Sequence, residues 1–318
     1  MTDAHPALAA WHEAGDGRLD LTRPADNLMA FGKTWSTFGE EPVVSCFHGS
    51  MYGWVEGRKL VPLFGFVGTG VTRVRLDQDD AGRWALTLRG KETGYFTDLA
   101  TGEVIDHWHN PFTDEDVEVY HFRNDRIGGV VGETMPVLTV GEHHDEGSRM
   151  NDDGTAAAGD EVPFVLPWQI YGDEVLLEWD YAHEYPNPVV PSLFPRASTG
   201  ERINPSEHFV IYTSRAELED PSLPTAHFRA GFSRVSPWWP WMRMGGFTFD
   251  TPVGRSNGVM TGRMFSRSCR RGLDDVPRPL VERVLRDDAS LLEPPTDWEV
   301  GPILSTWEAF ARDTPPEV

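Results

Sequence analysis

The sequence predicts a mainly β protein: a large antiparallel β-barrel or sandwich with short helices at the N- and C-termini. From about Val43 to Phe265 the chain divides into about ten short runs in which apolar and polar residues alternate. Turn signals of Gly, Pro, Asn and Asp recur every 8–14 residues, which is typical of antiparallel sandwiches and barrels rather than of βαβ units. Helical spacing is confined to the two ends of the chain.

The elements follow in order along the chain. HPALAAWHEA (5–14) has helical spacing and good helix formers, so it predicts a short leading helix. TRVRLDQDDAGRWALTLRG (72–90) predicts two strands around a DQDDAG turn, and KETGYFTDLATGEVIDHWH (91–109) two more around DLATGE. Further strands are expected in VEVYHFRND, EVLLEWDYAHEY, SEHFVIYTSRAE, TAHFRAGFSRV, FTFDT and GVMTGRMFS. Residues 277–292 and 302–313 predict closing helices.

This pattern predicts a single domain over residues 1–318. Its β core covers about 40–265, and a C-terminal helical segment covers about 277–313. The low-complexity stretch EHHDEGSRMNDDGTAAAGDE (142–161) is expected to be a flexible loop between strands. A division into two domains at this loop is the alternative.

Composition and charge exclude several classes of function. The net charge of −22 opposes nucleic acids and anionic membranes, because both attract basic patches. Cys46 and Cys269 are the only cysteines and predict no disulfide framework. With no signal-peptide pattern and no apolar run of about 18 residues, a cytoplasmic protein is expected. The common nucleotide-binding, zinc-protease and serine-hydrolase motifs are missing as well, so no cofactor is expected.

The first candidate site lies in EVLLEWDYAHEY (174–185). On a strand, one face would carry the apolar residues Val175, Leu177 and Trp179, followed by Tyr181, His183 and Tyr185. The apolar half predicts that this face points inward, so two hydroxyls and an imidazole would lie at one end of an apolar interior. We interpret Tyr181, His183 and Tyr185 as candidate catalytic residues, with an internally satisfied Tyr/His cluster as the alternative.

A second candidate site lies in the hairpin IDHWHNPFTDEDVEVYHF (105–122). If Asn110 pairs with Val117, His109 lies opposite Glu118 and His107 opposite Tyr120, an imidazole–carboxylate arrangement suited to proton transfer.

The other register of this hairpin predicts a metal site. If Pro111 pairs with Val117, His107 faces His121, and His107, His109 and His121 share one face. Three imidazoles can bind Zn or Fe. The sequence leaves both registers open, as well as a wet face of ordinary surface histidines.

SPWWPWMRMGG (236–246) concentrates three tryptophans, two prolines and two methionines in eleven positions. It is expected to seal an apolar interior, with Trp238 or Trp241 touching the cavity. The expected substrate-binding residues are Trp108, Tyr120, Trp179, Trp238, Trp241 and Met242.

Four stretches carry a family resemblance: YGWVEGRKLVPLFGFVG (52–68), YFTDLATGEVIDHWHNPFT (95–113), PSLFPRASTGE (191–201) and PWWPWMRMGG (237–246). Taken in this order, they resemble the bacterial domain of unknown function family 1838. The resemblance implies one homologous unit over roughly residues 25–250 and supplies no catalytic residues. A lipocalin-like barrel that holds an apolar ligand is similar in architecture only.

The expected function is an enzyme that acts on an apolar or aromatic small molecule in a water-excluded interior. The chemistry would be cofactor-independent acid–base catalysis of the isomerase, cyclase or lyase type. A non-catalytic protein that carries a hydrophobic ligand and a His-ligated metal enzyme are the alternatives. The expected partner is the hydrophobic small molecule, with no nucleic acid and no membrane; a homodimer is also considered.

Overall fold

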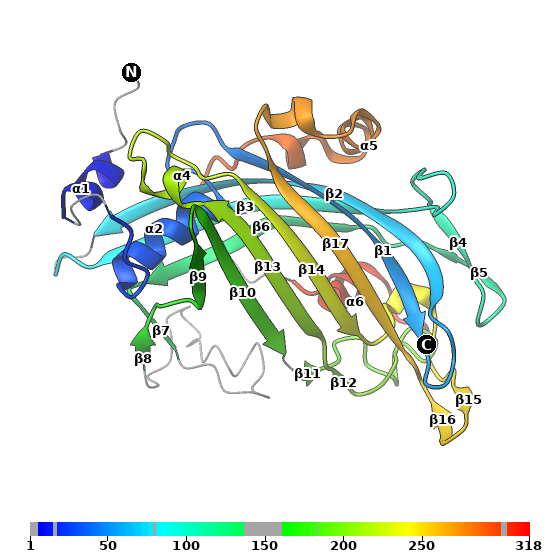
Figure 1. Ribbon diagram of the computed structural model, residues 1–318. Helices are drawn as coiled ribbons and strands as arrows, with labels where there is room; N and C mark the ends of the chain where they lie inside the picture. Colours follow the sequence, from blue (N-terminus) through cyan, green and yellow to red (C-terminus); the bar gives the residue numbers. More distant parts are fainter. Residues whose placement is uncertain (1–5, 15–17, 79–80, 137–160, 183, 300–303) are drawn as a thin grey trace.

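One curved antiparallel sheet forms the centre of the protein in a computed structural model (Figure 1). The structure describes residues 6–14, 18–78, 81–136, 161–182, 184–299 and 304–318. The sheet has nine strands in the order β6-β3-β2-β1-β17-β14-β13-β10-β9. These strands are β1 (Val43–Trp54), β2 (Val61–Gln78), β3 (Trp84–Thr97), β6 (Phe122–Gly132), β9 (Trp168–Tyr171), β10 (Glu174–Ala182), β13 (Ser206–Ser214), β14 (Phe228–Ser236) and β17 (Val259–Cys269).

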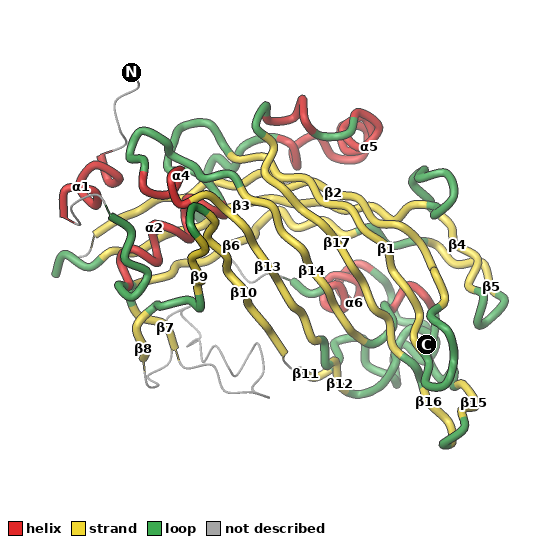
Figure 2. The backbone as a smooth tube through the Cα atoms, in the orientation of Figure 1, coloured by secondary structure: helices red, strands yellow, loops and turns green. Residues whose placement is uncertain are grey.

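Short hairpins and helices surround this sheet (Figure 2). The paired short strands are β4 (His107–Asn110) with β5 (Glu115–Glu118), β7 (Thr134–Pro136) with β8 (Glu161–Pro163), β11 (Tyr185–Pro186) with β12 (Arg202–Ile203), and β15 (Phe249–Thr251) with β16 (Gly254–Ser256). The helices are α1 (Pro6–Ala14), α2 (Pro24–Trp35), α4 (Arg215–Glu219), α5 (Arg278–Asp288), α6 (Thr306–Asp313) and the 3-10 turns η1 (Pro240–Met242), η2 (Gly272–Asp275) and η3 (Ala289–Leu292).

The β class is confirmed, but the predicted closure into a barrel is wrong. β6 and β9 form the two edges of the sheet and do not pair with each other. Alternation predicts which side chains share a face, whereas closure depends on strand tilt and stagger, which period-two patterns do not encode. Helices and short hairpins take the place of a second sheet, so the sandwich alternative does not describe the fold either.

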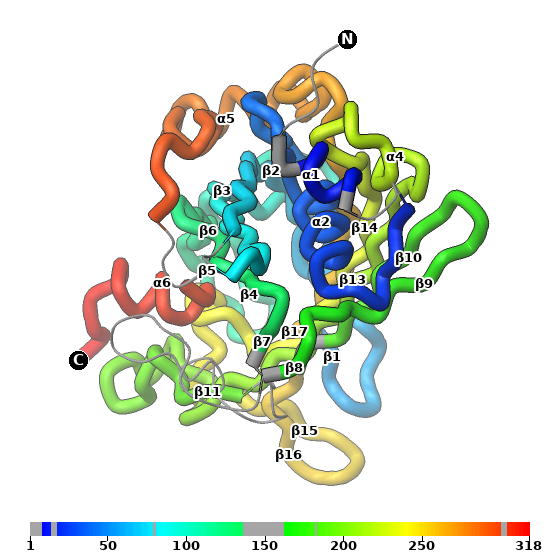
Figure 3. Tube along the Cα trace, turned by 90° about the vertical axis from the view of Figure 1, so that its left-hand side faces the viewer, coloured from blue at the N-terminus to red at the C-terminus, as the bar shows by residue number. Residues whose placement is uncertain are grey.

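The inner face of the curved sheet carries two apolar clusters. Figure 3 looks along the curve and shows α2 inside it and α5 outside. At one end, Leu28 and Met29 of α2 pack on Leu86 and Leu177 of the sheet; we call this group the α2 cluster. At the other end, the residues of η1 and α6 pack on β1, β2 and β3. We call this group the tryptophan cluster, after Trp108, Trp238, Trp239, Trp241 and Trp307.

The outer face is covered over β1, β2, β3 and β17 by α5. Leu280 and Val284 of this helix pack on Val44 and Val71, and Tyr95 belongs to the same cluster. Cys46 and Cys269 are buried here as free thiols. Charged residues on α5 then reach the polar groups at the edge of this cluster.

The predicted helices are found at the two ends of the chain, as α1, as α5 with η3, and as α6. Helix α2 has no counterpart in the prediction. Its sequence PADNLMAFGKTW begins with Pro24 in the first turn, a position that proline favours, but it contains Gly32, which weakens the helical signal. Each helix among the described residues is too short or too polar to span a bilayer. The expected loop at 142–161 lies almost wholly outside the described residues.

Candidate functional site

A row of half-buried side chains crosses the inner face between the two apolar clusters. On β3, Leu86 belongs to the α2 cluster and Phe96 to the tryptophan cluster, and Glu92 lies between them on the same face. On the neighbouring strands, too, a half-buried residue lies between the two clusters on this face. We call the row the central band and define it as Ser45, Glu92, Asn124, Trp179, Phe209, Phe232 and Ser266, all of them half-buried.

Aromatic rings form one side of the central band. Phe232 pairs with Phe209 across β14 and β13, and their ring centroids are 4.6 Å apart. Phe209 in turn lies opposite Trp179 of β10. Such rings present a large, rigid apolar surface, so this side of the band suits the body of an apolar or aromatic ligand.

On the opposite side of the band, two glycines let neighbouring groups approach the backbone closely. Gly70 pairs with both Ser45 and Glu92, and an added Cβ there would lie 3.2 Å from the Ser45 hydroxyl and 3.6 Å from Glu92 Cβ. At the nearby Gly68, an added Cβ would lie 2.1 Å from the ring of Phe47, which therefore packs directly on the backbone. Ser45 and Glu92 consequently flank a position that carries no side chain.

Glu92 brings a titratable group into this band. Its Oε1 accepts a hydrogen bond of 2.9 Å from Nδ2 of Asn124, the residue directly opposite on β6. Burial raises the pKa of the Glu92 carboxyl above its usual value of 4.5, and the Asn124 hydrogen bond opposes this shift. A carboxyl whose pKa is raised can hold a proton closer to neutral pH, as acid–base chemistry requires.

An ion pair lies beside the central band, on the side of the tryptophan cluster. Arg234 and Glu207, opposite each other on β14 and β13, form an ion pair of 3.3 Å, and each side chain is 18% exposed. The Arg234 guanidinium lies 5.5 Å from the ring centroid of Trp307. Tyr185 is close enough for Arg234 and Glu207 to affect its titration, and burial raises its pKa to about 12. Its phenol is therefore a hydrogen-bond donor at neutral pH.

The predicted alternation of EVLLEWDYAHEY is confirmed over its first part. Val175 and Leu177 are fully buried in the α2 cluster, while Glu178 and Asp180 are exposed on the other face. The strand ends at Ala182, and Tyr185 begins the separate strand β11. Tyr185 is buried in the tryptophan cluster.

The side chains of the other two members of that predicted site, Tyr181 and His183, are not among those that the structure describes. His183 lies outside the described residues. Of Tyr181 only the backbone is described, and it pairs with Glu207. The catalytic roles of Tyr181, His183 and Tyr185 therefore stay predictions.

The hairpin at 105–122 adopts neither predicted register. Trp108 pairs with Val117, which places His107 opposite Glu118 and His109 opposite Asp116. This β4–β5 hairpin extends from the body of the sheet (Figure 1), and its exposed face carries both histidines. The turn spans Pro111–Asp114, with Asp114 at a positive φ of 58°, so it is shorter than either predicted register requires.

The two histidines have acidic neighbours on that exposed face. His109 lies 3.1 Å from Asp116 and 3.3 Å from Asp114, and its side chain is 57% exposed. The buried face of the hairpin instead carries Trp108 and Asn110. His107 and His109 therefore point away from the apolar interior for which they were predicted as catalysts.

His121 lies on the outer face, beneath α5. Its Nδ1 accepts a hydrogen bond of 3.3 Å from the backbone N–H of Phe96, and its Nε2 lies 3.4 Å from Asp106. Burial, and secondly the positive charge of Arg283, lower its pKa to about 4. Arg283 also donates to both carboxylate oxygens of Asp106, so this group of polar side chains anchors α5 to the sheet.

The alternative metal site is not assembled among the described residues. His121 lies at the buried edge of the outer cluster, whereas His107 and His109 lie on the exposed face of β4. Within the described part of the chain, no group of three His, Cys, Asp or Glu side chains is placed to hold a metal ion.

The predicted ligand-lining tryptophans are in the core. Trp238 and Trp241 are each 1% exposed, and Trp238 Nε1 donates to the Asn257 carbonyl at 2.7 Å. Met242 is fully buried, and Trp108 packs edge-on against Trp241 at 5.8 Å between ring centroids. The segment SPWWPWMRMGG thus packs into an apolar cluster, while its sealing of a cavity and contact of these side chains with a ligand stay predictions.

Tyr120 packs against the tryptophan cluster of the inner face at the last helix. Its hydroxyl donates to Asp313 Oδ2 at 2.8 Å, and its ring packs edge-on against Phe310 at 5.7 Å. Burial, and then the neighbouring Asp313 carboxylate, raise the pKa of Tyr120. These contacts join the segment after β5 to α6, and the role of Tyr120 in substrate binding stays a prediction.

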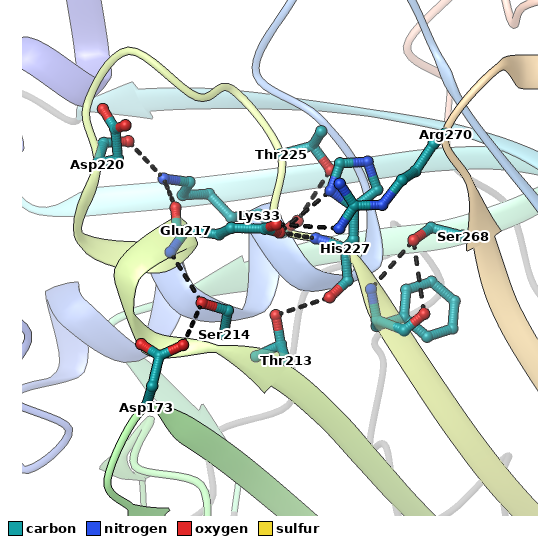
Figure 4. Close-up of polar contacts among 11 residues, drawn as sticks. Lys33, Asp173, Thr213, Ser214, Glu217, Asp220, Thr225, His227, Ser268 and Arg270 are labelled. Atoms are coloured by element: carbon teal, nitrogen blue, oxygen red, sulfur yellow. Dashed lines mark hydrogen bonds and ion pairs between the residues drawn. The ribbon is translucent and has the colours of Figure 1, made fainter.

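A second buried charge, Lys33 of α2, lies in the polar network of Figure 4. Its side chain is fully buried, and Nζ donates to the carbonyl oxygens of Glu217 at 2.6 Å, Leu218 at 2.9 Å and Asp220 at 2.8 Å. These carbonyls end α4, where a helix leaves its last acceptors unsatisfied. Burial lowers the pKa of Lys33 to about 8, although the Asp220 and Glu217 carboxylates oppose the shift.

The rest of this network is also satisfied internally. Glu217 Oε2 accepts from the backbone N–H of His227 at 2.7 Å and lies 3.1 Å from His227 Nδ1, and Oε1 accepts from Arg270 at 3.1 Å (Figure 4). Lys33 uses all three of its donors, so its ammonium fastens α2 to α4 and has no donor left for a ligand.

The sequence analysis identifies neither Glu92 nor Lys33 as an inward-facing charge. Glu92 occurs in GKETGYF, where alternation and the two glycines are the only signal that this glutamate faces inward with no bulky neighbour. Lys33 occurs in a segment whose helical signal is weakened by Gly32. A charged residue inside an otherwise apolar helical face is the signal that would have identified it.

The chain belongs to the family described as "Protein of unknown function (DUF1838)", which matches residues 40–313. The family resemblance noted in the sequence is thereby confirmed, and the match reaches further toward the C-terminus than residue 250. No curated protein matches the sequence. Among solved structures, "Crystal structure of MucB in complex with MucA(peri)" is similar at 11% identity and a TM-score of 0.14, over 86% of this chain and 96% of that chain, a likeness too low to carry a structural argument.

Proposed function

We propose that this member of the DUF1838 family binds an apolar or aromatic small molecule against the central band and acts on it by acid–base chemistry. The observation that carries the proposal is Glu92, a half-buried carboxyl with a raised pKa on the inner face between two apolar clusters. An ionisable group in such a place costs stability, and groups of this kind concentrate at functional sites.

In this proposal each part of the band has a separate role. The rings of Phe209, Phe232 and Trp179 hold the apolar body of the ligand. Glu92 transfers a proton to or from it, and Asn124 orients the carboxyl through its 2.9 Å hydrogen bond. Glu92 thus takes the acid–base role that the sequence had suggested for the histidines.

Binding is tested with Nile red, an uncharged dye whose fluorescence rises in apolar surroundings. Phe232→Ala is expected to weaken binding about tenfold, because it removes a ring from the band. Phe265→Ala is the matched control, since Phe265 is opposite Gly231 on the outer face and 63% exposed. Equal affinities for the two variants would contradict the proposed location.

Catalysis is tested by deuterium incorporation. Proton transfer at carbon exchanges a C–H hydrogen with solvent, so an apolar extract of the source cells is incubated with the protein in heavy water. One component is expected to gain mass with the natural protein and not with Glu92→Gln. Equal incorporation with both proteins would show that Glu92 is not the acid–base group.

If Nile red binds but no component gains mass, the alternative of a non-catalytic carrier is favoured. Tyr185→Phe then distinguishes the second candidate group. The raised pKa of the Tyr185 phenol and the adjacent Arg234–Glu207 pair make it a hydrogen-bond donor for a ligand's polar end. Its removal is expected to weaken binding of a ligand with a polar head and to leave Nile red binding unchanged.

A further inference from the structure

A separate cavity of about 340 Å³ lies where three stretches of sequence meet. Phe112 comes from the β4–β5 turn, Arg196 from PSLFPRASTGE, and Arg243 and Phe247 from the end of the tryptophan-rich segment. This volume is typical of a small-molecule site, and its walls combine two guanidinium groups with two phenyl rings.

Each arginine already has one carboxylate partner. Arg196 Nη2 donates to Glu115 Oε2 at 2.5 Å, and Arg243 Nη1 is bonded to Glu317 near the end of the described chain. The guanidinium fork can bind a carboxylate through two parallel hydrogen bonds, which a lysine cannot do. The local charge is thus balanced between two arginines and two glutamates.

The backbone holds the two arginines in place. Arg243 has a left-handed conformation, with φ of 56°, which is uncommon for a residue other than glycine. Two residues later, Gly245 N donates to Arg196 O at 2.7 Å, and an added Cβ on Gly245 would lie 2.3 Å from the Pro195 carbonyl oxygen. Backbone strain of this kind is retained where it positions a functional group.

Glu317 shows how a carboxylate is bound beside this cavity. One of its oxygens accepts a hydrogen bond from the Arg243 guanidinium, and the other accepts one from the backbone N–H of Arg196 at 2.7 Å. The backbone N–H of Glu317 donates to Leu193 O at 2.9 Å, which holds the tail in place. A guanidinium and a backbone N–H therefore already bind the two oxygens of one carboxylate.

We propose that this cavity binds a small molecule that carries a carboxylate on a flat aromatic body, and that Glu317 competes with it for Arg243. On binding, the ligand carboxylate replaces Glu317 at Arg243, Glu317 moves into solvent, and the Arg196–Glu115 pair remains. The charge balance is preserved, and Phe112 and Phe247 flank the aromatic body. This site is independent of the central band.

The test uses 2-naphthoate and its uncharged analogue 2-naphthamide, with binding measured by calorimetry. Glu317→Gln is expected to tighten naphthoate binding about tenfold, because it removes the competing charge. Arg243→Gln is expected to weaken it at least tenfold, and 2-naphthamide binding should not follow either change. Arg255→Gln is the matched control, since its side chain is 74% exposed on β16.

Naphthoate affinity that is equal in the natural protein and Glu317→Gln would overturn the proposal. A naphthamide affinity that changes in parallel with that of naphthoate would also overturn it, because recognition would then not depend on charge. The Glu317→Gln comparison stands alone if Arg243→Gln fails to fold.

Discussion

Lys33 and Glu92 are both ionisable groups on the inner side of the sheet, and their surroundings differ in one respect. Lys33 is fully buried, and three carbonyl oxygens accept from its three N–H groups. Glu92 is half-buried and receives one side-chain hydrogen bond, from Asn124, among the described residues. Burial shifts the pKa of both groups toward the neutral form.

The number of hydrogen bonds that each group makes distinguishes Lys33, a structural charge, from Glu92, a candidate functional one. The ammonium of Lys33 completes the C-terminal end of α4, so it stabilises the junction of α2 with the sheet. Glu92 completes no other element, and its carboxyl has capacity for further hydrogen bonds. A partly buried charge lowers stability, and groups of this kind concentrate at functional sites.

Replacing Lys33 is expected to have the largest effect. Lys33→Met keeps the length of the side chain but leaves three buried carbonyl groups without a donor, at a cost of roughly 2–4 kcal/mol in the free energy of unfolding. Urea denaturation measures this loss, with Lys59→Met, an exposed substitution, as the control. A loss below about 0.5 kcal/mol would contradict the assignment of Lys33 to the structure.

His121 provides an intermediate case, because it is buried and held neutral. Its folded-state pKa of about 4 lies below the usual 6.5, so the unfolded chain binds a proton first as the pH falls. The resulting stability is complete above pH 6.5 and is lost between 6.5 and about 4, by roughly 1–3 kcal/mol.

His121→Gln is expected to remove this part of the pH dependence while retaining an acceptor for the Phe96 N–H. Urea midpoints measured across the same pH window test it. A variant whose stability still falls as steeply as that of the natural protein would show that another group is responsible.

Glu92→Gln is expected to act in the opposite direction from Lys33→Met. Because the folded-state pKa of Glu92 lies above its unfolded value, the natural protein loses stability as pH rises through and above 4.5. Glutamine keeps an acceptor for Asn124 without the charge, so it should stabilise the protein at pH 7 by roughly 1 kcal/mol, or about 2 °C in Tm.

This gain should disappear below pH 4.5, where the carboxyl is protonated in both states. Scanning calorimetry at two pH values checks both statements. A destabilised Glu92→Gln at pH 7 would place Glu92 with Lys33 as a structural charge.

The smallest expected effect comes from the partner of Glu92. Asn124→Ala removes the hydrogen bond that lowers the pKa of the carboxyl, so that pKa should rise further. We expect a loss of about 0.5–1 kcal/mol at pH 7, because the ionised carboxylate then has no side-chain donor. The loss should be smaller in the Glu92→Gln background, where Asn124 donates to a neutral amide oxygen instead of a carboxylate, and a double-mutant cycle measures this coupling.

Alternation in the sequence was sufficient to predict the β class, the long β2–β3 hairpin and the buried face of β10, because each depends on local period-two patterns. Sheet closure and the β4–β5 register were not predictable in this way. Closure depends on strand tilt and on the helices that fill the inner face, and the register depends on the length of one turn.

The sequence predicts some of the side chains on the inner face, but not which of them lie next to each other. Aromatic rings on the inner face follow from alternation, as Trp179 shows. The surroundings of Glu92 are set by strands far apart in the sequence, since Ser45, Glu92 and Asn124 come from β1, β3 and β6. The sequence does not show that these strands lie in one part of the sheet. The exposed face that His107 and His109 share follows from the register of the β4–β5 hairpin, which the sequence leaves open.

The affinity of Nile red as a function of pH tests the role of Glu92 most directly. An uncharged apolar ligand on the central band should bind more tightly when Glu92 is protonated, so affinity should fall as the pH rises through the raised pKa of that carboxyl. In Glu92→Gln the affinity should be high and independent of pH over the same range. The same pH dependence in both proteins would contradict the assignment of the central band as the ligand site.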